Sequence, residues 1–233
     1  MHPVFEEADI KLTPKQVQQL EQYSRLLVKW NQRINLTAIR SPSEIRVKHL
    51  LNSLTCLRVM RGTPMKCVVD VGTGAGFPGL VLKIAHSEIE LTLVESITKK
   101  TNFCRRVVET LGLENVEVIT ARAEEVGRMV DHREMYDWGV ARAVASMSVL
   151  AEYLLPLVRV GGWMLAQKGK DGHEEAQHAE NAIRILGGRL DRVVPVTLPG
   201  VGEPRTLVVI EKVSPTPERY PRRIGIPAKR PLS

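Results

Sequence analysis

The most constraining feature of this chain is a short run of valines that ends at Asp70 and leads directly into a turn rich in glycine. Val68, Val69 and Val71 are typical of a strand buried on both faces of a parallel sheet. The glycines that follow can adopt positive φ and allow a ligand to approach the backbone, and Pro78 suits the first turn of a helix. The segment therefore predicts a strand, a turn and a helix start whose free N–H groups can hold the polar end of a nucleotide cofactor.

Two cofactor classes fit this turn. The spacing from Gly74 to Gly79 matches the dinucleotide pattern G-x-G-x-x-G, which leaves a nicotinamide or flavin cofactor as an alternative. An acid at the end of the strand would repel a pyrophosphate, but it can meet the ammonium group of a methionine moiety. The pattern D-x-G-x-G-x-G therefore favours S-adenosylmethionine over a dinucleotide, and over a turn that binds nothing. The predicted contacts in this segment are Asp70, Gly72, Gly74 and Gly76.

Further candidate contacts follow the next two apolar runs. Glu95 ends the run 91–94, at the sheet edge where open α/β folds bind ligands, and its carboxylate can accept both ribose hydroxyls. Its alternative role is that of a solvated acid near the start of the helix predicted over 97–111, with Ser96 as the N-cap. Ala123 and Glu124 follow the run 116–120, where such folds contact the adenine.

The order of the local signals predicts an α/β fold. We expect strands and helices to alternate from Cys67 onward, with Gly161-Gly162 preceding a fifth strand at 163–167. The runs 192–198 and 206–212 are joined by a loop too short for a parallel crossover, so they should pair as antiparallel neighbours. The remaining predicted elements are a fourth strand at 136–141 and helices at 147–158 and 174–186. The prediction is a mostly parallel, Rossmann-like sheet with one antiparallel strand of a C-terminal hairpin.

We expect three parts along the chain. Residues 1–62 should form a helical extension, since Thr13 and Ser41 each begin a helix start signal with proline at the next position. Residues 63–213 should form the cofactor-binding domain. Residues 214–233 form a proline-rich tail with five basic side chains and one acid, which is either disordered or an arm that turns its guanidinium groups toward phosphates.

Composition restricts the class of protein. A formal net charge of +7 favours a polyanionic partner. The three cysteines indicate neither a disulfide framework nor a zinc site, and we expect no metal. No apolar stretch approaches the roughly 20 residues of a membrane span, and the acidic N-terminus is unlike a signal peptide, so we expect a cytoplasmic protein. Nothing in the sequence indicates a large apolar interface, and a monomer is expected.

Several short motifs, taken in their order and spacing, closely resemble one family, the bacterial 16S rRNA (guanine-N7) methyltransferases known as RsmG or GidB. The resemblance runs from about residue 13 to the C-terminus, and it rests on the segments 35–37, 49–54, 70–79, 95–100, 122–124, 142–143, 168–169, 205–209 and 220–223. It implies a class I methyltransferase fold, S-adenosylmethionine as the methyl donor and N7-methylguanosine in 16S rRNA as the product. The family's cofactor contacts would fall on Gly72, Phe77, Ala123, Glu124 and Arg142.

This chemistry needs few side chains. Guanine N7 carries a lone pair and no proton, so direct in-line transfer depends on positioning rather than on a general base. Arg142, the predicted catalytic residue, would contact the cofactor carboxylate or the guanine edge, with a surface ion pair as its alternative. The predicted RNA contacts are Lys99, Lys100, Lys168, Arg222 and Arg223, although the three lysines are also compatible with solvated element ends. The competing functions are a small-molecule or protein methyltransferase and a non-catalytic RNA-binding module.

Overall fold

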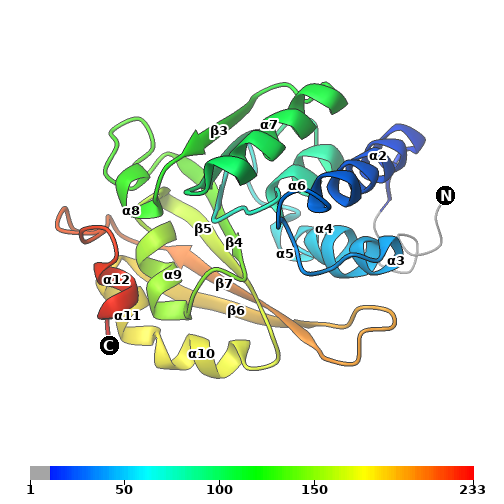
Figure 1. The fold of residues 1–233 in the computed structure, drawn as a ribbon. Coiled ribbons are helices and arrows are strands. Elements are labelled where there is room, and N and C mark those ends of the chain that lie inside the picture. The colour runs from blue at the N-terminus through cyan, green and yellow to red at the C-terminus, as the bar shows by residue number, and fades with distance from the viewer. Residues whose placement is uncertain (1–10) are drawn as a thin grey trace.

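A computed structural model describes residues 11–233, so the first ten residues of the predicted helical extension lie outside the described part of the chain. The fold is built on a seven-stranded sheet with the order β3-β2-β1-β4-β5-β7-β6 (Figure 1). All neighbouring strands are parallel except β7, which runs antiparallel to both β5 and β6. The predicted sheet and its C-terminal hairpin are confirmed. The strands are β1 (Cys67–Val71), β2 (Glu90–Glu95), β3 (Val116–Thr120), β4 (Tyr136–Arg142), β5 (Val158–Lys168), β6 (Gly188–Val196) and β7 (Arg205–Lys212).

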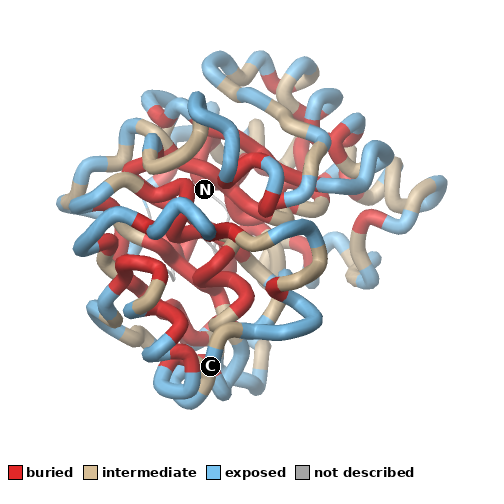
Figure 2. Tube along the Cα trace, turned by 90° about the vertical axis from the view of Figure 1, so that its left-hand side faces the viewer, coloured by how far each residue is buried: buried red, intermediate tan, exposed pale blue. Residues whose placement is uncertain are grey.

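Helices cover both faces of the sheet (Figure 1), because its central strands are apolar on both sides. The buried residues gather in the interior of the molecule (Figure 2). In β2, for example, Leu91 and Leu93 belong to one buried cluster while Val94 belongs to the other. The first face packs against α6 (Gly79–Ala85) and α7 (Thr98–Leu111). The second face packs against α8 (Ala123–Val126), α9 (Met147–Leu154), α10 (Gly172–His178) and α11 (Glu180–Ile185).

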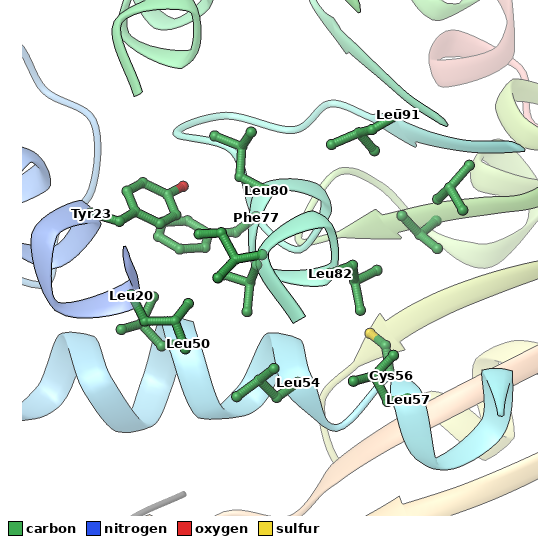
Figure 3. Close-up of a cluster of buried hydrophobic side chains, with 14 of the residues drawn as sticks. Leu20, Tyr23, Leu50, Leu54, Cys56, Leu57, Phe77, Leu80, Leu82 and Leu91 are labelled. Carbon is green, nitrogen blue, oxygen red and sulfur yellow. The ribbon is translucent and has the colours of Figure 1, made fainter. Parts of the chain in front are cut away.

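The N-terminal helices share the core of the first face. Thr13 forms the predicted capping box of α2 (Pro14–Asn31), whose buried side chains include Leu20 and Tyr23. Both residues belong to the cluster that contains Phe77 and Leu80 (Figure 3). The second expected helix is a series of short elements, α3 (Pro42–Glu44), the π-helix η1 (Ile45–Leu51), α4 (Asn52–Leu54) and α5 (Leu57–Met60). The Ser41 side chain makes no cap bond to this helix.

Several predicted boundaries are wrong. Helix α9 ends at Leu154 instead of residue 158, and β6 spans Gly188–Val196 instead of 192–198. Strand β5 begins at Val158, five residues before the expected start, because Gly161 and Gly162 lie within it. They belong to a bulge, since the β4 partners shift from Tyr136 opposite Val158 to Trp138 opposite Trp163. The helix expected over 174–186 is two helices, α10 and α11, separated at Ala179.

The C-terminal tail is packed on the domain, close to α9 (Figure 1), and contains one helical turn, α12 (Ile226–Lys229). The Arg222 guanidinium pairs with the Glu152 carboxylate of α9 at 2.6 Å, and the Arg222 N–H donates to the same carboxylate. The Glu152 side chain is fully buried. The orientation predicted for Arg222, toward phosphates, is therefore wrong, because the guanidinium balances a buried charge inside the protein.

No helix among residues 11–233 is both long and apolar enough to cross a membrane.

We expect Arg222→Ala to lower the free energy of unfolding by about 3 kcal/mol, because it leaves the buried Glu152 carboxylate without its counterion. Arg223→Ala is the matched control. It removes the same charge from the next residue, which is exposed, and should change stability by no more than about 0.5 kcal/mol. Urea unfolding of both variants tests this, and equal losses of stability would contradict it.

Candidate functional site

The glycine turn is closed by the Asp70 carboxylate. Its Oδ2 accepts a hydrogen bond from the Thr73 hydroxyl at 2.6 Å and one from the Gly79 N–H at 2.7 Å. Burial raises the pKa of Asp70 to about 6, although both hydrogen bonds act in the opposite direction. The side chain is fully buried and does not reach a cavity wall. The structure thus gives one oxygen of Asp70 a role in shaping the turn, and its direct contact with the cofactor stays a prediction.

The backbone of this turn has the predicted conformation. Gly72, Gly74 and Gly76 all have positive φ, between 61° and 94°. A Cβ atom at Gly72 would lie 2.6 Å from a Val144 methyl group, so glycine is also needed there for the close approach of another loop. Helix α6 follows the turn directly and is anchored to Asp70 through the Gly79 N–H.

A cavity of about 220 Å³ opens where β1, β2 and β4 end. Four predicted cofactor contacts line it together: Gly72, Glu95, Ala123 and Glu124. Other residues that line the cavity were not predicted as cofactor contacts, and of these Ser96, Val144 and Tyr153 add polar and apolar surface. Ser96 could have been predicted as a lining residue, because it directly follows Glu95 at the edge of the sheet. Tyr153 lies in α9, and no pattern in the sequence indicates that it lines the cavity.

Glu95 connects the two loops that border this cavity. Its Oε2 accepts from the Gly74 N–H at 3.1 Å, and its Oε1 accepts from the Ile97 N–H at 2.9 Å. The carboxylate is buried and is not the solvated acid of the alternative interpretation. Helix α7 has Ile97 at the N-cap position, so the capping role expected of Ser96 is also wrong.

Glu124, which also lines the cavity, is held by the C-terminal tail. Its Oε1 accepts from the Gly225 N–H at 2.9 Å, which ties α8 to the segment that follows Arg222 and Arg223. Nearby, Pro221 packs so closely on Gly127 that a Cβ atom at Gly127 would lie 2.9 Å from the proline ring. The tail therefore supports the cavity wall formed by Ala123 and Glu124.

Phe77 lies beside the glycine turn, outside the cavity wall. Its ring is 4% exposed and stacks between Tyr23, at 5.1 Å, and His49, at 4.7 Å. Figure 3 shows the ring of Tyr23, from α2, lying against that of Phe77. Neither Gly74 nor Gly76 lines the cavity either. Of the predicted cofactor contacts, these three residues and Asp70 therefore shape the turn, and the structure does not bring them to the cavity.

Arg142 lines a second cavity, of about 290 Å³, which shares the wall residue Ala143 with the first. Ala143 has a φ of 55°, a strained conformation for a residue with a side chain. The second cavity is strongly basic, because four of its lining side chains are cationic and one is acidic. These residues are Lys48, Arg142, Lys168, Arg205 and Glu175.

Arg142 has no acidic partner within ion-pair distance among residues 11–233, so it is not the surface ion pair of the alternative interpretation. Its guanidinium lies 5.0 Å from the centre of the Phe77 ring and 3.2 Å from His49 Nδ1. Burial lowers the pKa of Arg142, and the nearby Asp70 opposes this shift. Arg142 is therefore a cationic side chain without a carboxylate partner among the described residues, next to the residue that the two cavities share.

The predicted RNA-contacting residues have different surroundings. Lys99 and Arg223 are exposed and have no ion-pair partner in the described part of the chain. Lys100 lines the first cavity, 3.8 Å from Glu95. Lys168 pairs with Glu175 at 2.7 Å and donates to the Ala145 carbonyl, so its ammonium is already engaged.

A larger cavity, of about 680 Å³, lies at the opposite edge of the sheet, where β1 and β2 begin. It is lined by residues of both charges, such as Lys66 and Glu90, and contains none of the predicted site residues. The carboxyl edge of the sheet, where ligands bind in open α/β folds, is the better candidate.

The first cavity fits S-adenosylmethionine. The backbone of Gly72 has no side chain to fill the cavity, and Glu95 and Glu124 line the same cavity. The buried Asp70 Oδ1 close by has no hydrogen-bond partner among the described residues, so the turn retains an unused acceptor.

We expect Gly72→Ala to weaken S-adenosylhomocysteine binding roughly tenfold, because the new methyl group collides with Val144 at the cavity wall. Gly112→Ala is the matched control, since that glycine also has a left-handed φ but has open space around it and lies outside the cavity. Both variants should lose about 1–2 kcal/mol of stability. Calorimetric titration distinguishes them, and equal affinities would contradict the assignment of this cavity.

Comparisons with known proteins find similarity along most of the chain. The family model described as "rRNA small subunit methyltransferase G" matches residues 16–201. Two proteins named ribosomal RNA small subunit methyltransferase G are each 52% identical to the chain. The one from Pelotomaculum thermopropionicum aligns over 97% of this chain and 95% of its own length. The one from Roseiflexus castenholzii aligns over 96% and 94%, respectively.

Solved structures share the fold at low sequence identity. A mutant of MtNAS in complex with S-adenosylmethionine has a TM-score of 0.56 at 18% identity and covers 85% of this chain and 75% of its own. TYW2 from M. jannaschii in complex with AdoMet has a TM-score of 0.53 at 13% identity, with coverages of 70% and 77%. The fold is therefore that of the class I S-adenosylmethionine-dependent methyltransferases. With a family model that spans most of its length and relatives about half identical to it, the chain belongs to the rRNA small subunit methyltransferase G family.

Proposed function

We propose that this protein methylates N7 of a specific guanosine in 16S rRNA by direct in-line transfer from S-adenosylmethionine. The observation that carries the proposal is the pair of cavities that adjoin at Ala143, one suited to the cofactor and the other basic. Family membership supports the substrate class, because the relatives are named as small-subunit rRNA methyltransferases. An rRNA substrate would place the activity in the cytoplasm.

In this proposal the first cavity holds the cofactor. Gly72 would face its methionine end, Glu95 the ribose hydroxyls, and Ala123 and Glu124 the adenine. When bound, the cofactor supplies an electrophilic methyl group on its sulfonium. Val144 lies close to Gly72 and also lines this cavity.

The second cavity would receive the target base. Guanine presents the N7 and O6 acceptors side by side, and Arg142 is a donor that can reach either this edge or the cofactor carboxylate. N7 has no proton to lose, so no side chain needs to act as a base. His49 is the titratable ring nearest to Arg142, and burial lowers its pKa to about 3, which keeps it neutral near pH 7. Catalysis in this site would come from orientation rather than from proton transfer.

The charge around the cavities suits a single-stranded RNA loop. Lys48, Arg142, Lys168 and Arg205 line the acceptor cavity, and a guanine in a loop can leave its stack to enter it. Lys99 and Arg223 are exposed near the cofactor cavity, because Lys99 adjoins Lys100 and Arg223 lies two residues before Gly225. We propose these two as contacts to the phosphates. Lys100 and Lys168 would contribute positive potential, and Arg222 would act by anchoring the tail.

Incubation of the protein with radiolabelled S-adenosylmethionine and either unmethylated small subunits or naked 16S rRNA tests the function. After nucleoside digestion we expect the label in N7-methylguanosine at one site. Gly72→Ala should lose labelling at low donor concentration, whereas Gly112→Ala should retain it. Label in another nucleoside would disprove N7 specificity. Donor binding without labelling of either RNA would favour a small-molecule or protein substrate.

We expect the double variant Lys99→Ala/Arg223→Ala to weaken RNA binding and to reduce the slope of log K against log salt by about 2, one for each lost phosphate contact. The matched control is Lys15→Ala/Lys66→Ala, which removes the same charge from residues that line the cavity at the opposite edge of the sheet. Binding titrations at several salt concentrations measure both slopes. The same slope for the two double variants would contradict the proposed RNA face.

A further inference from the structure

A chain of polar contacts runs from the loop after α2 to the cavity that contains Arg142. It begins at Asn31, whose side-chain oxygen accepts from the N–H groups of Leu36 and Thr37 and whose amide donates to the Thr37 carbonyl. The Thr37 hydroxyl oxygen also accepts from the Ile39 N–H at 3.1 Å. The three bonds to the Asn31 side chain hold this loop against the end of α2, and the bond from Ile39 fixes the local turn at Thr37.

The next contact is between Thr37 and His49, which lies on η1. The Thr37 hydroxyl is 2.8 Å from His49 Nε2, and the His49 ring is stacked on Phe77. On the other side of the ring, His49 Nδ1 lies 3.2 Å from a terminal nitrogen of Arg142. The imidazole thus fills the space between the N-terminal loop and the cavity.

The chemistry of these partners determines where the imidazole proton lies. A guanidinium can only donate hydrogen bonds, so His49 Nδ1 must accept from Arg142. The proton of the neutral ring is then on Nε2, where it is donated to the Thr37 hydroxyl oxygen. A doubly protonated ring would direct an N–H toward the Arg142 cation, and burial together with this cation disfavours that form.

Among the acceptors around Arg142, His49 Nδ1 is the nearest. The Lys48 carbonyl, the His49 carbonyl and the Ser53 hydroxyl are 3.4–3.5 Å from the guanidinium, and no carboxylate pairs with it in the described residues. The orientation of the Arg142 guanidinium therefore depends chiefly on its contact with His49 Nδ1.

We propose that His49, held by Thr37 as the neutral Nε2–H tautomer, is a positioning residue that orients Arg142 at the junction of the two cavities. This assigns a role to two sequence motifs, 35–37 and 49–54, that lie outside the cofactor-binding segment. It also makes the N-terminal helical unit part of the reaction site without placing any of its side chains on the reacting atoms.

Nitrogen-15 NMR of the imidazole rings tests the tautomer without any activity. The chain has six histidines, and His49→Asn assigns the relevant signal by its loss. At neutral pH we expect His49 to carry its proton on Nε2 and a bare Nδ1. In Thr37→Val, which removes the acceptor, this preference should weaken. A proton on Nδ1, or a doubly protonated ring, would overturn the proposal.

A kinetic cycle tests the coupling to Arg142 and rests on the proposed function, because its readout is radiolabelled methyl transfer to the small subunit. His49→Phe keeps a stacked ring but removes the acceptor, and it should lower kcat about tenfold. His49→Asn places an oxygen near the former Nδ1 and should recover most of this loss. In an Arg142→Ala background, His49→Phe should have almost no further effect.

Losses that multiply in the double variant, or equal losses in His49→Phe and His49→Asn, would overturn the positioning role. If the wild-type protein labels no RNA, the proposed function fails, while the tautomer measurement still decides whether the Thr37–His49–Arg142 chain exists.

Discussion

The rest of the site depends on the hydrogen bonds of the buried Asp70 carboxylate. One oxygen of this side chain binds both the Thr73 hydroxyl and the Gly79 N–H, so the end of β1, the glycine turn and the start of α6 are held as one unit. This explains the glycine at 79. A Cβ there would lie 2.9 Å from the carboxylate oxygen and 2.7 Å from a Leu93 methyl group. The third glycine of the G-x-G-x-x-G pattern thus permits close packing of helix and strand.

The N-terminal and C-terminal additions act on the same turn and cavity from opposite sides. From the N-terminal unit, Tyr23 and His49 enclose the Phe77 ring, and the Tyr23 hydroxyl donates to the Ala75 carbonyl within the turn. From the C-terminal tail, the Gly225 N–H binds Glu124 at the cavity wall. The N-terminal unit therefore packs in the buried cluster on one face of the sheet, the tail packs in the cluster on the other face, and both support one site.

The elements that local sequence determines were predictable, and those set by distant partners were not. The positive φ values of Gly72, Gly74 and Gly76 follow from the turn itself, and the antiparallel β7 follows from a short loop. The inward orientation of Arg222 depends on Glu152, 70 residues earlier, and no local pattern encodes that pairing. The position of Asp70 at the end of the strand was predictable, but no local pattern shows that one oxygen of its carboxylate binds Thr73 and Gly79 of the turn.

A crystal structure with S-adenosylhomocysteine and guanosine monophosphate bound together would test the two-cavity account most directly. The account predicts the cofactor product between Glu95 and Glu124, and the base in the cavity of Arg142, with N7 directed at the sulfur past Ala143. A base bound outside that cavity, or one that turns its Watson–Crick edge toward the sulfur, would contradict it.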